Sequence, residues 1–324
     1  MLLFSLKKFV LATAIASMSV VVGMNSQLAL ASASMVKTPA PGYFRLMLGD
    51  FEVTAINDGT VTLPVEQLLV QPHEKTHEAL AHNFLTTPLE TSVNTFLINT
   101  GNKLVLIDVG AGSLFGPTLG KLVSNLKASG YDPVQIDEIY ITHMHTDHIG
   151  GLIANNELLF PNAIIYADKK EANFWLNKSN MDKAPAEQKD LYINAMAALN
   201  PYKTANQFAP FKEHVSSTPG IKSYSGYGHT AGHTIYEVES KGQKLVLIGD
   251  LIHVAAVQFD HPEVTITFDS DQKKAAATRK KIFKDLAKGD TLIGASHIQF
   301  PGLGHVRKDG KSYEWFPVNF TQMH

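Results

Sequence analysis

The most informative segment of the chain is Thr142-His143-Met144-His145-Thr146-Asp147-His148-Ile149-Gly150-Gly151. Three histidines and one aspartate fall within six positions, directly after a strand predicted over 136–142. Alternate residues of an extended chain point to the same side, so His143 and His145 lie together, and the following turn brings Asp147 and His148 toward a second point. Two neighbouring ions need a divided ligand set of this kind. The segment therefore predicts a dinuclear metal site, and the alternative is a solvated, histidine-rich turn.

Three later segments place further metal-ligand residue types at the ends of predicted strands. They are Gly228-His229-Thr230-Ala231-Gly232-His233, then Asp250 after the apolar run 245–249, and His297 after the run 292–296. Polar side chains just beyond buried strands are typical of a site at the rim of a sheet. The chain contains no cysteine, so a metal site must use histidine, carboxylate and water. Such ligands suit zinc and also accept manganese, iron or cobalt.

The composition is that of a globular protein without a strong charge. Of 324 residues, 44% are hydrophobic and 18% are charged, and the formal net charge is −2. A chain of this length fits one large domain or two small ones. The near-zero charge gives no field that attracts nucleic acid or an anionic membrane, so we expect neither as a partner.

Residues 1–33 have the pattern of a secretory signal peptide. Lys7 and Lys8 precede an apolar run over 9–24, and small residues in A-x-A order follow over 29–33. The alternative is an uncleaved membrane anchor, but the apolar run is short and is interrupted by two serines and a glycine. We expect cleavage, no stable membrane anchor, and a periplasmic or secreted product that begins near Ala33.

Hydrophobic periodicity and turn residues predict the order of the elements in the mature chain. Strands 51–56 and 61–63 are expected to form a hairpin around Asn57-Asp58-Gly59. Further strands are expected over 94–99, 104–109, 163–167, 234–239, 244–248 and 291–295. Helices are expected from Pro117 to Gly130, over 186–199, and from Asp269 to Gly289, with 169–215 inserted over the core as helices and loops. Strand groups that are each followed by a helix, twice over, predict an α/β fold, the αββα sandwich, in a single catalytic domain over 34–324.

The order of these motifs resembles the metallo-β-lactamase fold superfamily, from the first strands through His297. Carried over residue by residue, the resemblance implies a first metal on His143, His145 and His229 and a second on Asp147, His148 and His297. Asp250 bridges the two ions together with a hydroxide in this scheme. Asp108 matches an aspartate that supports the ligand loop in the family, and a plain turn residue at the end of a strand is an equal alternative.

The resemblance also implies the chemistry. Two divalent ions, expected to be Zn²⁺, lower the pKa of a shared water so that hydroxide exists near neutral pH, and one ion polarises the bond under attack. No serine or cysteine nucleophile is needed, although Asp250 can take part in proton transfer. His253 occupies the position of a tyrosine that binds the substrate carbonyl in lactonases of the superfamily, so it either donates a hydrogen bond to the substrate or lines the pocket.

Several other side chains have weaker signals. His233 is expected to support the site without binding metal. An apolar wall for the substrate is one interpretation of Trp175, Phe268 and Phe300, and core packing is the other. Surface or packing roles are expected for the remaining histidines, which are His73, His77, His82, His214, His261, His305 and His324.

Within the superfamily the chain is most similar to methyl parathion hydrolase and related lactonases. The similarity rests on Gly249-Asp250-Leu251-Ile252-His253 and on the segment 297–305. Class B β-lactamases either use a cysteine ligand or lack the bridging aspartate. Glyoxalase II carries a basic C-terminal part, and ribonuclease-type members need a basic track, neither of which this sequence shows.

The predicted function is therefore an exported dinuclear hydrolase that attacks a lactone or aryl ester. Hydrolysis of organophosphate triesters is the alternative, and a non-hydrolytic diiron or metal-binding protein is a second one from a different class. The expected substrate is small and apolar, and a homodimer is expected because relatives are often dimers.

Overall fold

The computed structural model describes residues 33–155, 157–212 and 218–321, and Ala40–His324 form one compact unit. The predicted signal peptide therefore lies almost wholly outside the described residues, as do His214 and His324. Within the described part of the chain, none of the helices is both long and apolar enough to cross a membrane.

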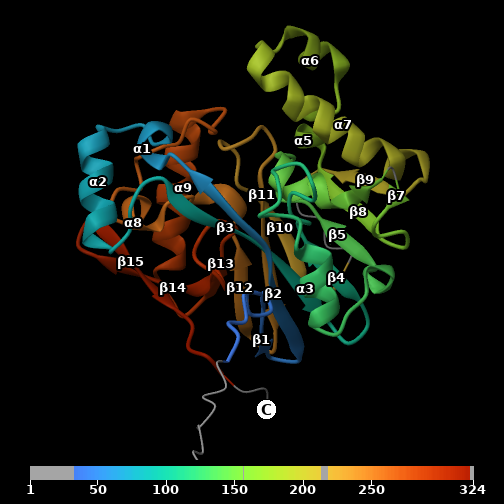
Figure 1. The fold of residues 1–324 in the computed structure, drawn as a ribbon, viewed down its shortest axis with the longest axis horizontal. Coiled ribbons are helices and arrows are strands. Elements are labelled where there is room, and N and C mark those ends of the chain that lie inside the picture. The colour runs from blue at the N-terminus through green and yellow to red at the C-terminus, as the bar shows by residue number, and fades with distance from the viewer. Residues whose placement is uncertain (1–32, 156, 213–217, 322–324) are drawn as a thin grey trace, which may run out of the picture. The chain divides into compact units, whose positions relative to one another are not determined.

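Two sheets form the centre of this unit (Figure 1). The first contains, in spatial order, β1 (Tyr43–Leu48), β2 (Phe51–Leu63), β3 (Leu89–Asn99), β4 (Leu104–Ile107), β5 (Glu138–Tyr140), β8 (Ile164–Asp168) and β9 (Phe208–Phe211). The second contains β10 (Ile221–Ser225), β11 (Thr234–Ser240), β12 (Gln243–Leu247), β13 (Leu292–Gly294), β14 (Leu303–Asp309) and β15 (Ser312–Pro317). β6 (Ile153–Ala154) and β7 (Glu157–Leu158) pair separately.

Helices cover the outer faces of both sheets. They are α1 (Val65–Leu68), α2 (His73–His82), α3 (Leu122–Ala128), α4 (Thr146–Ile149), α5 (Lys169–Trp175), α6 (Lys178–Lys183), α7 (Lys189–Thr204), α8 (Ala255–Gln258) and α9 (Gln272–Leu286). In Figure 1, α3 and α7 lie beside the first sheet, and α8 and α9 lie on the side of the second. The predicted αββα sandwich is confirmed.

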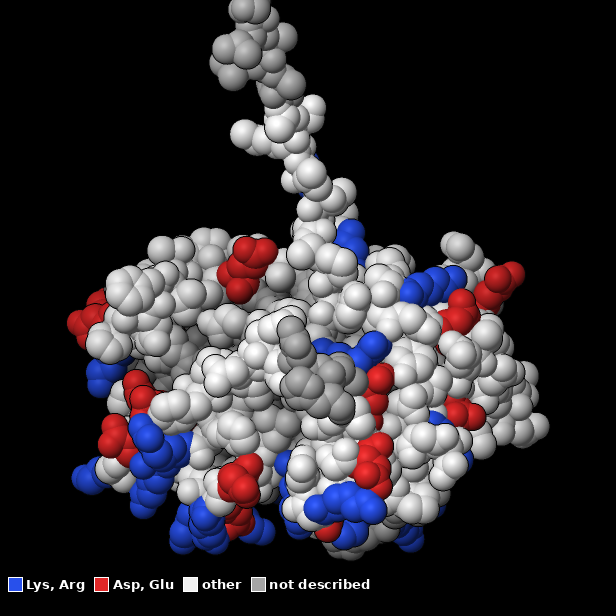
Figure 2. Space-filling model, turned by 90° about the horizontal axis from the view of Figure 1, so that it is seen from below, with Lys and Arg blue, Asp and Glu red and all other residues white. Residues whose placement is uncertain are grey.

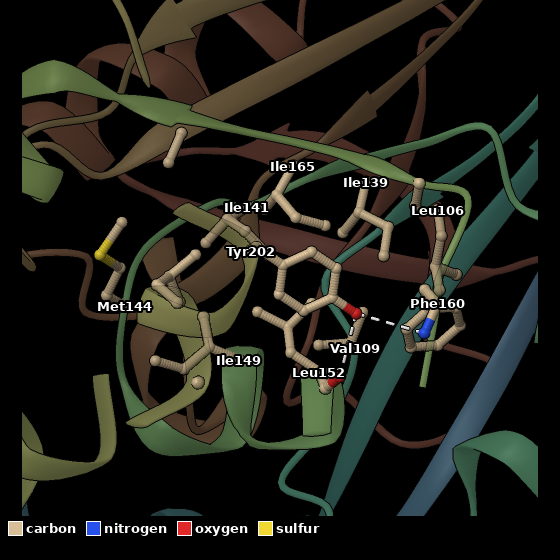
Figure 3. Close-up of a cluster of buried hydrophobic side chains, with 14 of the residues drawn as sticks. Leu106, Val109, Ile139, Ile141, Met144, Ile149, Leu152, Phe160, Ile165 and Tyr202 are labelled. Atoms are coloured by element: carbon tan, nitrogen blue, oxygen red, sulfur yellow. Dashed lines mark hydrogen bonds between the residues drawn. The ribbon is translucent and has the colours of Figure 1, made fainter. Parts of the chain in front are cut away.

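The alternation of side chains along the strands divides the core into layers. Val105 and Ile107 of β4 belong to the cluster between the two sheets, whereas Leu106 between them packs toward the helices. The helix-side cluster, shown in Figure 3, centres on Tyr202 of α7. Its hydroxyl donates to the carbonyl oxygen of Leu152 at 3.0 Å and accepts from the backbone nitrogen of Phe160 at 3.2 Å. These bonds fix α7 against the segment that follows the 142–151 motif.

The predicted hairpin at Asn57-Asp58-Gly59 is wrong. β2 is one continuous strand, paired with β1 on one side and β3 on the other, and its register with β3 shifts between Asn57 and Gly59. The reason is the Asp58 carboxylate, which is buried and accepts hydrogen bonds from the backbone nitrogens of Ala111, Gly120 and Leu122 at 2.9, 3.1 and 2.9 Å. Asn57-Asp58-Gly59 therefore form a β-bulge, which directs the Asp58 carboxylate toward the loop over 111–120.

Other elements also differ from prediction. The helix expected from Pro117 begins at Leu122, because residues 111–120 form a loop that Asp58 holds at both ends. The strand expected over 136–142 covers only Glu138–Tyr140. The inserted region contains more than helices and loops, because β9 extends the first sheet in parallel with β8.

Candidate metal centre

The predicted ligands come from four segments that follow strands. His143, His145, Asp147 and His148 lie in or before α4, after β5, while His229 lies between β10 and β11. Asp250 follows β12 in the short helix Gly249–Leu251, and His297 follows β13. A hydrogen bond from the Thr234 backbone nitrogen to the Thr142 carbonyl oxygen, 2.8 Å long, ties the second sheet to the first ligand segment. The sandwich thus brings all four segments to one place.

The Asp250 carboxylate lies at the centre of the histidines. Its Oδ2 atom is 3.5 Å from Nε2 of His143, 3.4 Å from Nε2 of His229 and 3.1 Å from Nε2 of His297. Its Oδ1 atom is 3.1 Å from Nε2 of His148. One carboxylate therefore touches histidines from both predicted ligand sets, which is the position that a bridging ligand requires.

The remaining predicted ligands complete two adjacent groups. Nδ1 of His145 lies 3.1 Å from Nε2 of His229. Oδ2 of Asp147 lies 3.5 Å from Nε2 of His297 and 3.7 Å from Nε2 of His148. Two groups of predicted ligands result whose ligand atoms lie within 4.8 Å of one another, namely His143, His145, His229 and Asp250, and Asp147, His148 and His297. Asp250, His253 and His297 form a third group of this kind.

Unpaired polar atoms show that this centre fits a cation. Among the described residues, Nε2 of His143, Nε2 of His148 and Oδ1 of Asp250 are buried and have no hydrogen-bond partner, although they lie close together. A buried polar group without a partner costs about 1–3 kcal/mol. Lone pairs that converge without forming hydrogen bonds are the arrangement that a metal ion satisfies, so the donor set fits two divalent ions.

The outward-facing nitrogens of three rings are held by acceptors. Nδ1 of His148 lies 2.8 Å from Oδ2 of Asp108, and Nδ1 of His229 lies 2.8 Å from Oδ1 of Asp269. Nδ1 of His297 lies 3.0 Å from the carbonyl oxygen of Ser92. Because these partners accept hydrogen bonds, each Nδ1 carries a hydrogen, and in the neutral form of each ring Nε2 keeps a lone pair that faces the centre.

Asp108 supports the ligand segment rather than acting as a turn residue alone. Its Oδ1 accepts the backbone N–H of Thr142 at 2.8 Å, and its Oδ2 accepts the Thr142 hydroxyl at 2.7 Å and contacts His148. The Thr142 hydroxyl oxygen in turn lies 3.0 Å from Nδ1 of His143. Asp108 adopts a positive φ of 58° to make these contacts. It therefore orients ligands of both groups.

The electrostatics favour positive charge at the second group. Burial lowers the pKa of His143 and His229 well below the ordinary value, and it lowers that of His145 to about 3. Burial also disfavours charge on His148, but Asp250, Asp147 and Asp108 outweigh it and raise the pKa of His148. For Asp250, burial would raise the pKa, and the histidines around it lower it well below its usual range. The carboxylate-rich side of the centre thus attracts a cation.

His233 has the supporting role that the sequence predicts. Its Nε2 atom accepts the backbone N–H of Asp250 at 3.1 Å, and its Nδ1 atom lies 3.1 Å from the carbonyl oxygen of Gly226. Burial lowers the pKa of His233 to about 4, so the ring is neutral at pH 7. The backbone of Gly249 lies close to this ring, and a Cβ atom at position 249 would be only 2.7 Å from Nε2 of His233. A side chain there would therefore displace the ring.

His253 lies in direct contact with the central carboxylate of Asp250. Nε2 of His253 is 3.1 Å from Oδ2 of Asp250, and its ring stacks on that of His297 with centroids 5.3 Å apart. Its buried Nδ1 atom has no hydrogen-bond partner among the residues that the structure describes. A small recess beside the centre is lined by Leu85, Leu89, Glu90, Thr91, Ser92, His253, Val254, Ala255, Ala256, His297 and Gln299.

The predicted apolar wall is only partly present. Phe300 packs in the cluster between the sheets, so the wall interpretation is wrong for this residue. Trp175 is buried, its ring meets that of His145 edge to face at 5.5 Å, and its indole nitrogen donates to Glu171. Phe268 is 41% exposed and its ring lies 6.1 Å from that of His253.

The described histidines assigned to surface or packing roles are exposed, except His305, which is half-buried.

Sequence reasoning missed the carboxylate of Glu171. It is buried and accepts the backbone N–H groups of Met144 and Gly232 at 2.9 and 2.7 Å and the hydroxyl of Thr230 at 2.8 Å. Glu171 therefore joins the two histidine segments of the first group. No local pattern marks it, because its hydrogen bonds to Met144, Thr230 and Gly232 span 27 to 61 positions. Asp269 and Arg279 were missed for the same reason.

Comparison with known proteins agrees with this geometry. The family model described as "Metallo-beta-lactamase superfamily" matches residues 89–297. The crystal structure of hydrolase AbOPH, in the beta lactamase superfamily, is 41% identical, with a TM-score of 0.84 over 88% of this chain and 100% of that one. AidC, a dizinc quorum-quenching lactonase, is 28% identical, with a TM-score of 0.81 over 87% of this chain and 99% of that one.

Curated relatives match smaller parts of the chain. "Beta-lactamase-like protein 2 homolog" of Caenorhabditis elegans is 29% identical over 56% of this chain and 53% of its own length, so the chain spans about half of that relative. "Probable metallo-hydrolase YybB" of Bacillus subtilis is 26% identical over 56% of this chain and 70% of its own length.

Proposed function

Because this chain belongs to the metallo-beta-lactamase superfamily, we propose that it is a dinuclear metal-dependent hydrolase of lactones or aryl esters. The observation that carries the proposal is the Asp250 carboxylate, which contacts histidines of two adjacent groups while buried lone pairs around it remain unpaired. The similarity to hydrolase AbOPH and to the dizinc lactonase AidC supports it.

His143, His145 and His229 would hold one ion, and Asp147, His148 and His297 the other, with Asp250 between them. Zinc suits these nitrogen and oxygen ligands. When bound, such ions supply a water of lowered pKa and polarise the substrate carbonyl. The chain's own contribution is rigidity, because Asp108, Asp269 and the Ser92 carbonyl fix the rings before substrate arrives.

Asp250 stays ionised across the neutral range, since the surrounding histidines hold its pKa well below its usual value. It therefore acts as a permanent anion between the two groups. His253 orients this carboxylate through Nε2 and leaves Nδ1 facing no protein partner. We assign His253 to contact with the substrate, because among the described residues it is the unpaired polar group that also lines the adjacent recess. Since Nε2–H donates to the Asp250 carboxylate, Nδ1 of the neutral ring would accept a hydrogen bond from the substrate.

The mixed charges on one face support an uncharged substrate, while the recess, at about 20 Å³, is too small to enclose one. Its lining combines five small or aliphatic residues with polar ones beside His253 and His297. On the face of the described chain seen in Figure 2, basic and acidic side chains are interspersed and form no continuous basic band. An electrostatic track for a polyanion is therefore not offered by that face.

The deciding experiment is a panel assay of the zinc-loaded protein on a lactone, an aryl ester, a phosphotriester and a β-lactam. We expect hydrolysis of the lactone or the aryl ester to be fastest. Fastest turnover of the phosphotriester would support the alternative substrate class, because the same centre can serve a tetrahedral phosphorus. Failure to hydrolyse any of the four, in a protein that contains two metals, would refute the proposal. An oxo-iron absorption band would instead indicate the diiron alternative.

A further inference from the structure

Arg279 of α9 is buried in the interior beside the metal centre. Its guanidinium donates from Nε to the carbonyl oxygen of Leu251 at 2.5 Å and from Nη1 to that of Val264 at 2.7 Å. Burying a guanidinium is costly unless its donors are paired. Leu251 directly follows Asp250, so one of these bonds holds the segment that carries the central carboxylate.

The same guanidinium faces the carboxylate of Asp269. Nη2 of Arg279 lies 3.7 Å from Oδ2 of Asp269, which also accepts the backbone N–H of Ile266 at 3.1 Å. The other oxygen, Oδ1, lies 2.8 Å from Nδ1 of His229. The backbone nitrogen of Ser270 adds a 2.8 Å bond to the carbonyl oxygen of His229. An unbroken path of contacts therefore runs from Arg279 through Asp269 to His229.

We infer that Asp269, held in place by Arg279, is a positioning residue that sets the metal affinity of the His143, His145 and His229 group selectively. This inference rests on the proposed metal-dependent function. Asp269 fixes the tautomer and orientation of His229, and Arg279 fixes Asp269 while also holding the main chain next to Asp250. Neither residue contacts the second group.

The second group has its own support, which makes the selectivity measurable. Nδ1 of His148 is held by Asp108, and Nδ1 of His297 by the Ser92 carbonyl. Removing the Asp269 carboxylate should therefore lower the affinity for the ion of the first group about 10- to 100-fold. The affinity for the ion of the second group should stay nearly unchanged. A residue with a merely structural role would lower the affinity of both ions together.

The test measures both zinc dissociation constants by competition with a chromophoric chelator, without reference to activity. The effect of Asp269→Ala on zinc affinity is measured in two single variants that each retain one intact ligand group. These variants are His297→Ala, which retains the first group, and His145→Ala, which retains the second. In His297→Ala, where the first group holds the remaining ion, Asp269→Ala should weaken binding about 10- to 100-fold. In His145→Ala, where the second group holds it, the same change should have little effect. Asp269→Asn, which keeps an acceptor oxygen for His229, should restore part of the affinity.

Asp271→Ala is the matched control, because Asp271 lies in the same loop and caps α9 through the Lys274 backbone nitrogen without touching a ligand. Its zinc affinities should equal those of the parent. Equal losses in both backgrounds, or no loss in His297→Ala, would overturn the inference while leaving the proposed function intact. A parent protein that binds no zinc would instead refute the proposed function. Circular dichroism of the metal-free variants separates misfolding from loss of binding.

Discussion

Nε2 of His233 accepts the backbone N–H of Asp250 at 3.1 Å, so a histidine outside the candidate ligand groups fixes the segment that carries the central carboxylate. Without this acceptor the Asp250 amide is buried and unpaired, and the chain can shift to find another partner. His233→Ala should therefore lower zinc affinity about 10- to 100-fold, with activity partly restored by excess zinc. Zinc retained after dialysis measures the effect. His305→Ala, a half-buried histidine whose Nδ1 lies 3.2 Å from the Thr291 carbonyl oxygen, should retain its zinc.

His145→Ala removes a predicted ligand of the first group. We expect loss of metal from that group and of nearly all hydrolysis, while the fold survives, because the hydrophobic clusters around the sheets do not depend on this ring. Metal analysis, the circular dichroism spectrum and hydrolysis rates provide the three readouts. Full activity in this variant would contradict the assignment of the site.

His253→Phe keeps a ring of similar shape and removes both nitrogens. Because Nδ1 is the unpaired atom beside the recess, turnover of lactones should fall more than zinc content does. Steady-state kinetics on a lactone, paired with metal analysis of the same sample, separate the two effects. Unchanged turnover would show that His253 lines the recess without taking part in the reaction.

Asp58 predicts a pH-dependent contribution to stability. Burial raises the pKa of its carboxyl to about 6, although three backbone N–H groups oppose the shift. The unfolded value is about 3.9. The folded protein therefore binds more protons between these values, so the contribution of Asp58 to the free energy of unfolding falls as pH rises from about 4 to about 6, and is constant above that range.

The matched comparison is urea unfolding of the metal-free parent and of Asp58→Asn at several pH values. The parent should lose about 2–3 kcal/mol relative to the variant across this window. A difference between the two proteins that stays constant with pH would show that the carboxyl titrates normally.

Export remains a prediction from residues 1–33. Expression with the full N-terminus in a bacterium, followed by N-terminal sequencing of the periplasmic or secreted protein, should give a first residue near Ala33. A chain that keeps Met1 and stays with the membrane fraction would support the anchor alternative.

The layer order and the candidate ligand segment 143–148 could be predicted because their signals are local, whereas the division of the candidate ligands into two groups came from the family resemblance. Scarce histidines at fixed spacings after apolar strands identify the 143–148 segment without reference to the rest of the chain. The bulge at Asn57-Asp58-Gly59 could not be distinguished from a hairpin turn, since the contacts that decide it are made by Asp58 with residues 53 to 64 positions later. Glu171, Asp269 and Arg279 escaped prediction because they act across the fold.

Asp58 also has a consequence for how this protein can change. Its single carboxylate ties the loop at Ala111, Gly120 and Leu122, while the tip carries Leu114 and Phe115, each 45% exposed. The exposed side chains at the tip take no part in the three hydrogen bonds, which Asp58 accepts from backbone nitrogens. Substitutions at the exposed tip should therefore leave the Asp58 tie and the strands that it holds in place.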